Sequence, residues 1–192
     1  MKAVVLDAAP AADARTREAA DAVVAALEAR GAEVDRVVAR DLDVRACTGC
    51  FGCWTRTPGQ CVIADGARSI AEKVIASDVY AIVTPVAFGS LGSLAKGVQD
   101  RLICLVLPHF TMIDGEVHHR PRYERYPAMV ALGTLPAPNA EQSALFDRLV
   151  ERNAVNLHSS SHAALTIAGE EPAAPAAERL LDAAGLRAEV TA

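Results

Sequence analysis

The sequence lacks features that mark several large classes of protein. No apolar run reaches the roughly 18 residues that a membrane-spanning helix needs, so we expect no membrane contact. Basic residues are not in excess: 19 of them stand against 24 acidic ones, and the net charge of −5 argues against a nucleic-acid partner. The apolar run Lys2 to Leu6 meets Asp7 too early for a signal peptide. We therefore expect a cytoplasmic protein whose cysteines stay reduced.

A dinucleotide-binding motif is also missing, because no glycines follow the G-x-G-x-x-G pattern. A nicotinamide cofactor would therefore have to stack directly on another cofactor rather than occupy a site of its own. No internal repeat or linker is present, and 192 residues are an ordinary length for one domain. We expect a single domain over residues 1–192, with a cysteine loop at 45–66 and a polar insertion at 108–127 that contains the turn signal Asp114-Gly115.

Short apolar runs alternate with segments of helical spacing along the chain. The runs are typical of buried parallel strands, and we expect them at residues 2–6, 34–38, 79–84, 128–132 and 163–167. We expect helices at residues 16–30, 67–76, 93–107, 141–157 and 172–184. Asp65, Ser93 and Asn139 would cap three of them. This alternation predicts an α/β fold, an open five-stranded parallel sheet in the flavodoxin-like order 2-1-3-4-5 with helices on both faces.

The topology also predicts where a ligand would bind. In such sheets the site lies beyond the carboxyl ends of the first and third strands, where the strand order reverses. Loops at residues 7–16 and 85–92 would bound this crevice. The cysteine loop follows the second strand, so we expect it to open on the same edge of the sheet, near the ligand site.

Four of the five cysteines fall within fifteen residues. Cys47, Cys50, Cys53 and Cys61 have the spacing C-x2-C-x2-C-x7-C, in which the two-residue gaps let successive thiolates turn around one centre. The pattern favours a [4Fe-4S] cluster, although the fourth cysteine lies further off than in bacterial ferredoxins. Zinc, a dithiol/disulfide couple and a metal-free loop stay open as alternatives. Cys104 lies on an apolar helix stripe, which is typical of a core residue.

Three groups of residues match the motifs of one known family. They are Cys47 to Trp54 with Cys61-Val62-Ile63, Thr84-Pro85-Val86, and Lys96 with Asp100-Arg101. Over residues 2–135 the sequence resembles the NADPH-dependent FMN reductase family and, within it, the iron-sulfur flavoproteins. The cysteine motif is typical of that branch, whereas the other two groups are typical of the wider family. We interpret Asp100-Arg101 as a structural pair at the base of the site.

The resemblance implies FMN at the crevice, a NAD(P)H donor, and a homodimer or homotetramer. The flavin ring would lie against residues 85–90 and the loop after the fourth strand. The residues implied for FMN binding are Arg15, Thr16, Pro85, Val86, Ala87, Phe88, Gly89, Ser90, Gly133 and Thr134. Ala87 stands where relatives often carry an aromatic residue, so stacking on the ring would fall to Phe88 or Trp54.

The first loop departs from the family pattern. Relatives usually have Gly-Ser-x-Arg followed by small hydroxylated residues, whereas this chain reads Asp7 to Thr16 with no glycine and with Pro10, which has no N–H. Asp7 and Asp13 would repel the FMN phosphate and oppose the attraction of the helix N-terminus. Arg15 would offset one of these charges, and Thr16 offers the one hydroxyl of the loop.

A basic stretch runs from His118 to Arg125 on an otherwise acidic protein. Its arginines would receive the phosphates of NADPH or an acidic partner, or the stretch is a solvated or subunit-contact loop. His158 and His162 are most simply surface histidines.

These patterns together predict an FMN-dependent oxidoreductase. It would pass electrons from NAD(P)H or a reduced carrier to a flavin, quinone or electron-carrier acceptor, with a [4Fe-4S] cluster as relay. We expect no catalytic side chain, because the flavin carries the chemistry. The alternative is a non-enzymatic metal-binding or redox-sensing module that has lost FMN.

Overall fold

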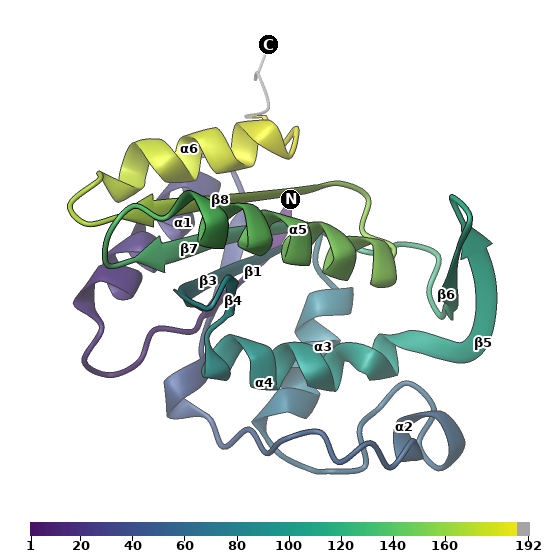
Figure 1. Cartoon of the computed structure of the whole chain (residues 1–192). Helices are drawn as coiled ribbons and strands as arrows, with labels where there is room; N and C mark the ends of the chain where they lie inside the picture. Colours follow the sequence, from purple (N-terminus) through teal and green to yellow (C-terminus); the bar gives the residue numbers. More distant parts are fainter. Residues whose placement is uncertain (188–192) are drawn as a thin grey trace.

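The computed structural model describes residues 1–187 of the chain. Its central sheet has five parallel strands in the order β2-β1-β3-β7-β8, and the short β4 (Ser90–Leu91) pairs antiparallel with the end of β3. The parallel strands are β1 (Lys2–Asp7), β2 (Glu33–Val38), β3 (Val79–Ala87), β7 (Ala128–Leu135) and β8 (His162–Ala168). The predicted flavodoxin-like order is confirmed (Figure 1).

Helices cover both faces of the sheet, and each face buries its own core (Figure 1). One face carries α1 (Ala14–Ala29) and α6 (Ala173–Ala183). The other face carries α3 (Gly66–Ile75), α4 (Ser93–Arg101) and α5 (Ala140–Asn156). The first core consists largely of alanine and valine, so its helices pack close to the strands, whereas the second contains the larger Tyr80 and Phe146. Within residues 1–187 no helix is long and apolar enough to cross a membrane.

Side-chain caps fix where two of the predicted helices begin. Asp65 accepts the Ala67 N–H before α3, and Asn139 accepts the Gln142 N–H before α5, as predicted. The third predicted cap is wrong: Gly92 precedes α4 without a side-chain hydrogen bond, and Ser93 is already helical. The predicted length of that helix is also wrong. Helix α4 ends at Arg101, and a 3-10 turn, η2 (Leu102–Leu105), leads directly into a strand. Pro108 therefore lies within that strand and does not end the helix.

The predicted polar insertion at 108–127 is largely a β-hairpin. Strand β5 (Val106–Ile113) pairs antiparallel with β6 (Glu116–Pro121), and Asp114 and Gly115 form the turn between them with φ of 48° and 84°. Both positive values suit the tight turn that the Asp-Gly pair predicted. The hairpin projects from the body of the protein, beside the carboxyl end of α5 (Figure 1).

Candidate functional site

The crevice predicted at the carboxyl ends of the strands is bounded by a tight hairpin. Strand β3 continues to Ala87, reverses at Phe88 and Gly89 with φ of 52° and 73°, and returns as β4. The reversal leaves the Phe88 side chain 97% exposed at the tip. The predicted ring-binding segment 85–90 is therefore a rigid ribbon with an aromatic ring free at its end.

Three glycines allow this ribbon to pack closely against its neighbours. A Cβ on Gly89 would come within 2.5 Å of the Leu145 side chain, one on Gly133 within 2.5 Å of Val86, and one on Gly92 within 2.9 Å of Pro85. Hydrogen bonds add to the packing. The Gly92 N–H donates to Thr84 Oγ1 at 3.0 Å, and the Gly89 N–H donates to Gln142 Oε1 at 3.3 Å. These contacts hold the hairpin in a fixed position at the carboxyl ends of the strands.

The β1–α1 loop holds its two aspartates in structural roles. Asp7 is fully buried. Its carboxylate forms ion pairs with Arg36 at 2.8 Å and Arg40 at 3.4 Å, and it accepts the Ala9 N–H at 3.0 Å. Asp13 is the N-cap of α1, where it accepts the Thr16 N–H at 2.9 Å and the Thr16 hydroxyl at 2.6 Å. The Asp7 carboxylate therefore faces two arginines rather than a ligand. The Asp13 carboxylate accepts the Thr16 N–H, a helix N-terminal donor that a phosphate would otherwise use.

The two threonines predicted to bind FMN are brought together by the fold. Thr16 Oγ1 lies 2.5 Å from Thr134 Oγ1, across the joint between α1 and β7, and both residues are buried. Because both hydroxyls hydrogen-bond within the protein, they are poorly placed to receive a phosphate.

Arg15 is the predicted phosphate ligand whose position fits that role best. Its Nη1 pairs with Glu18 at 2.9 Å, and its Nη2 donates to the Glu171 carbonyl, while its Nε is buried with no partner among the described residues. An unpaired guanidinium donor beside a helix start suits an anion. The residues therefore fit FMN at the ring end, and at the phosphate end they fit through Arg15 rather than Thr16.

The cysteine loop does not stay at this crevice, so the prediction that it opens there is wrong. The loop leaves the sheet after the 3-10 turn η1 (Ala39–Asp41) and carries α2 (Gly52–Thr55) to the end of α4 that lies away from β4 (Figure 1). All four cysteines line a cavity of about 630 Å³ together with the carboxyl halves of α4 and α5. None of residues 85–90, 133 or 134 lines that cavity. The thiols and the crevice thus lie near opposite ends of the same two helices.

Arg101 determines this path. Its guanidinium, 2% exposed, binds Asp65 at 2.8 and 3.0 Å, the Arg45 carbonyl at 2.6 Å and the Ile63 carbonyl at 3.1 Å. Arg45 and Ile63 flank the first and the last cysteine of the loop. One buried cation therefore joins the two ends of the loop. Arg101 does not pair with Asp100 as predicted: its partner is Asp65, and Asp100 pairs with Lys96 at the surface.

The environments of the thiols differ. The Gly52 N–H and then the Thr48 hydroxyl lower the pKa of exposed Cys50, whereas burial raises the pKa of Cys53. Burial also raises the pKa of Cys104 to about 12, as expected of a core residue. Over residues 1–187, no three cysteine, histidine or acidic side chains lie close enough together to hold a metal ion.

The basic stretch is held mainly by backbone carbonyls. Arg120 donates to the Phe110 carbonyl, and Arg122 donates to those of Cys104 and Val106. His118 is buried between Asn156 and Glu116, whereas Arg125 is 84% exposed. From this exposed position Arg125 pairs with Asp78 at 3.5 Å. His158 is not a free surface histidine, because its Nε2 contacts the His119 carbonyl at 2.7 Å.

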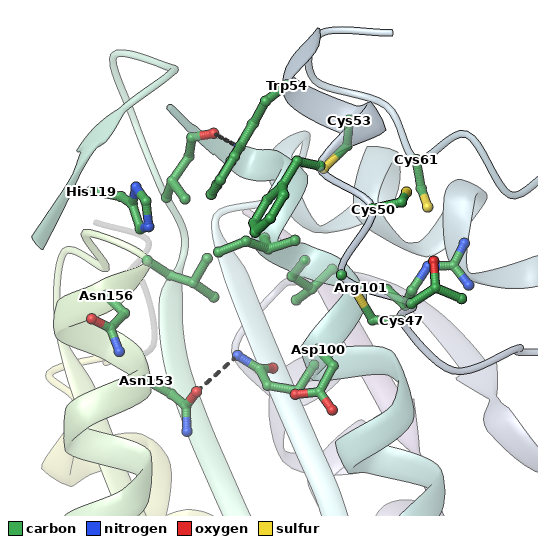
Figure 2. A pocket seen from close by; sticks show the side chains of 18 of the residues that line it. Cys47, Cys50, Cys53, Trp54, Cys61, Asp100, Arg101, His119, Asn153 and Asn156 are labelled. Atoms are coloured by element: carbon green, nitrogen blue, oxygen red, sulfur yellow. Dashed lines mark hydrogen bonds between the residues drawn. The ribbon is translucent and has the colours of Figure 1, made fainter. Parts of the chain in front are cut away.

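Several polar residues of the cavity were missed from the sequence. Gln99 comes from α4, and Asn153 and Asn156 come from α5. Figure 2 shows the two asparagines around the same cavity as Trp54 and His119. The three-residue spacing of the two asparagines was the available signal, since it places both on one helix face. Gln142, which holds the crevice hairpin, had no signal in the sequence.

Comparison with known proteins agrees with the fold. The family model described as NADPH-dependent FMN reductase matches residues 1–166. A search of curated proteins found no match.

Solved structures with the same architecture share little sequence with this chain. A NAD(P)H:quinone oxidoreductase from Methanothermobacter marburgensis has a TM-score of 0.67 and 16% identity, over 93% of this chain and 96% of that one. The NADH:FMN oxidoreductase EMOB in its apo form has a TM-score of 0.63 and 16% identity, over 94% and 86%. An FMN-dependent NADH-azoreductase from Bacillus anthracis, in complex with FMN, has a TM-score of 0.64 and 12% identity, over 96% and 98%. At these identities the likeness shows the fold alone.

Proposed function

The chain belongs to the NADPH-dependent FMN reductase family and is an oxidoreductase, and we propose that FMN binds in the crevice between the β1–α1 loop and the β3–β4 hairpin. Electrons would enter from NAD(P)H and leave to a flavin, quinone or electron-carrier acceptor. The observation that supports this proposal most strongly is the preformed hairpin, with Gly89 and Gly133 packed against their neighbours and Phe88 free at the tip.

Each part of the crevice has a separate task in this proposal. FMN supplies the electron-transfer chemistry, and the chain supplies orientation and exclusion of water. Pro85 to Ser90 would support the ring through backbone groups, with Phe88 against its face. Gly133 leaves room for Val86 and Phe146 to pack beneath the hairpin, and Thr134 contacts Thr16 beside it. Arg15 would hold the phosphate. A nicotinamide ring would then bind on the open face of the flavin, since the chain has no G-x-G-x-x-G motif.

The test is a titration of the apo-protein with FMN and, in parallel, with riboflavin, which has the same ring and no phosphate. Arg15→Ala should weaken FMN binding by about 1.5–3 kcal/mol, the value of a charged hydrogen bond, and leave riboflavin binding unchanged. Arg148→Ala is the matched control, because Arg148 is an exposed α5 residue paired with Glu151. No FMN binding at tens of micromolar would overturn the proposal and favour the alternative, a non-enzymatic module.

For the cysteine loop we propose a [4Fe-4S] cluster held by Cys47, Cys50, Cys53 and Cys61. The spacing supports it, as does the position of all four residues around one cavity. Because no three of them are close enough in this structure, the loop would have to close around the cluster. Anaerobic reconstitution should yield about four irons and four sulfides per chain, lost in Cys50→Ser. One zinc per chain, or no metal, would reject the cluster.

A further inference from the structure

The cavity beside the cysteine loop has two chemically different ends (Figure 2). The thiols lie at one end, near Asp100 and Arg101. The other end is lined by Trp54, His119, Asn153 and Asn156. Gln99, which hydrogen-bonds to Asn153, also lines it. The whole cavity has a volume of about 630 Å³, which lies in the range typical of small-molecule sites. Such sites are mainly apolar with a few placed polar groups. The apolar lining includes Leu102, Ile103, Val106, Leu149 and Leu157.

A chain of hydrogen bonds fixes which atom Gln99 presents. Asn153 donates its Nδ2 to the Leu149 carbonyl at 2.9 Å, so its Oδ1 is the atom that faces Gln99. Gln99 donates its Nε2 to that Oδ1 at 3.4 Å. Its Oε1 is therefore the free atom, and it is buried without a partner among the described residues. A buried carbonyl oxygen without a hydrogen bond is costly, so the site favours a ligand that donates one.

The aromatic wall is held rigidly in place. Trp54 donates its Nε1 to the Val106 carbonyl at 2.9 Å, and its ring stacks on Phe51 at 5.4 Å. The His119 ring lies 4.9 Å from both Trp54 and Phe110, and its Nδ1 is a second buried polar atom of this cavity without a partner among the described residues. The wall thus offers flat, apolar contact together with one polar atom.

We infer that this cavity binds a planar aromatic molecule with a hydroxyl or amino group on its edge. The ring system packs on Trp54 and His119, and the edge group donates to Gln99 Oε1. This second site is separate from the flavin crevice and does not depend on FMN, since the two share none of residues 85–90.

The test is calorimetric titration with 1-naphthol on protein saturated with FMN, which occupies the crevice. The paired probe is 1-methoxynaphthalene, which keeps the rings and has no donor. One site for 1-naphthol per chain is expected, with a Kd of roughly 0.1–1 mM for a ligand of this size. The methoxy compound should bind about five- to tenfold more weakly, corresponding to one lost hydrogen bond.

Variants place the ligand in the cavity. Gln99→Leu should weaken 1-naphthol about five- to tenfold and leave 1-methoxynaphthalene within about twofold. The control Gln60→Leu lies outside the cavity and should change neither affinity. Leu149→Phe should fill the apolar side and weaken both probes. The inference is overturned if 1-naphthol gives no heat up to its solubility limit. It is equally overturned if both probes bind alike, or if Gln99→Leu and Leu149→Phe both bind as wild type does.

Discussion

Arg101 is the residue on which the position of the cysteine loop depends most. Its side chain and that of Asp65 are each 1% exposed, and the two form a bidentate pair. Although burial opposes ionisation, the hydrogen bonds from Arg101 and the Arg45 N–H lower the pKa of Asp65. The pair is therefore ionised at neutral pH. The one other cation beside Asp65 among the described residues is Arg45, whose side chain is 60% exposed and whose Nε lies 3.8 Å from the carboxylate.

Arg101→Met should lower the free energy of unfolding by about 3–5 kcal/mol, because it leaves the Asp65 carboxylate buried without its bidentate partner and with only the exposed Arg45 nearby. Urea denaturation measures the change. Lys96→Met serves as the control, since Lys96 pairs with Asp100 at the surface, where such pairs contribute about 0–1 kcal/mol. Equal effects of the two substitutions would show that Arg101 does not anchor the loop.

Tyr80 illustrates a different cost of a buried polar group. Its hydroxyl lies in the core of the α3–α5 face, fully buried and without a partner among the described residues, and burial raises its pKa. Tyr80→Phe removes the unsatisfied hydroxyl and keeps the ring. We expect the free energy of unfolding to rise by about 1 kcal/mol. A loss of similar size in thermal or urea denaturation would mean that the hydroxyl has a partner after all.

Among the elements, the hairpin of β3 and β4 shows what a glycine contributes by its missing side chain. Gly133 on β7 lies under Val86 and the Phe146 ring, the latter 3.1 Å from where a Cβ would be. Gly97 lies within α4, and the nearest atom to its Cβ position, on Val44, is 4.0 Å away. The same substitution should therefore act in opposite directions at the two positions.

Gly133→Ala should cost about 1–3 kcal/mol of stability through overpacking, and it should also weaken FMN binding by displacing the hairpin. Gly97→Ala should add about 0.5–1 kcal/mol, because alanine restricts the unfolded chain and suits a helix interior. Thermal unfolding of both variants should show a lower Tm for Gly133→Ala and a higher Tm for Gly97→Ala than for the wild type. A neutral Gly133→Ala would mean that the hairpin is loose.

The order of the strands followed from the sequence because it depends on local periodicity and on one topological rule. The segment expected as a loop at residues 85–92 is instead mainly a hairpin, because β3 continues to Ala87 and pairs with β4. The path of the cysteine loop was not predicted, because Arg101 pairs with Asp65 across 36 residues of sequence and no local pattern records that pairing. The polar cavity wall was missed likewise, since Gln99 and Asn153 meet only when α4 and α5 pack together. Ser93 is not a cap because α4 begins at Ser93 itself. The preceding residue, Gly92, is the N-cap, and its N–H donates to Thr84 Oγ1.

At the scale of the whole molecule, the β5–β6 hairpin carries an exposed apolar surface that would suit the homodimer or homotetramer expected from the sequence. Phe110 and Met112 alternate along β5, and Val117 lies opposite Met112 on β6, so all three project from the same side of the hairpin. They are 62%, 62% and 64% exposed. Large exposed apolar side chains gathered on one face are typical of a protein contact.

Met112→Lys combined with Val117→Lys should shift the protein toward smaller species in sedimentation velocity, because charge on this face opposes its burial against a second copy. Leu145→Lys, on an exposed part of α5, is the control and should leave the distribution unchanged. A wild-type monomer, or an oligomer that survives the double substitution, would remove the hairpin from the subunit contact.

Helices α4 and α5 connect the crevice to the cavity, because each begins beside the β3–β4 hairpin and lines the cavity with its other end. The two helices therefore offer a path by which binding at one site would change the affinity of the other. If a cavity ligand changes the affinity for FMN by some factor, FMN must change the affinity for that ligand by the same factor. The oxidised and reduced flavins are two ligands in this sense. A cavity ligand that prefers the protein with reduced FMN would raise the midpoint potential of the flavin, and one that prefers the oxidised form would lower it.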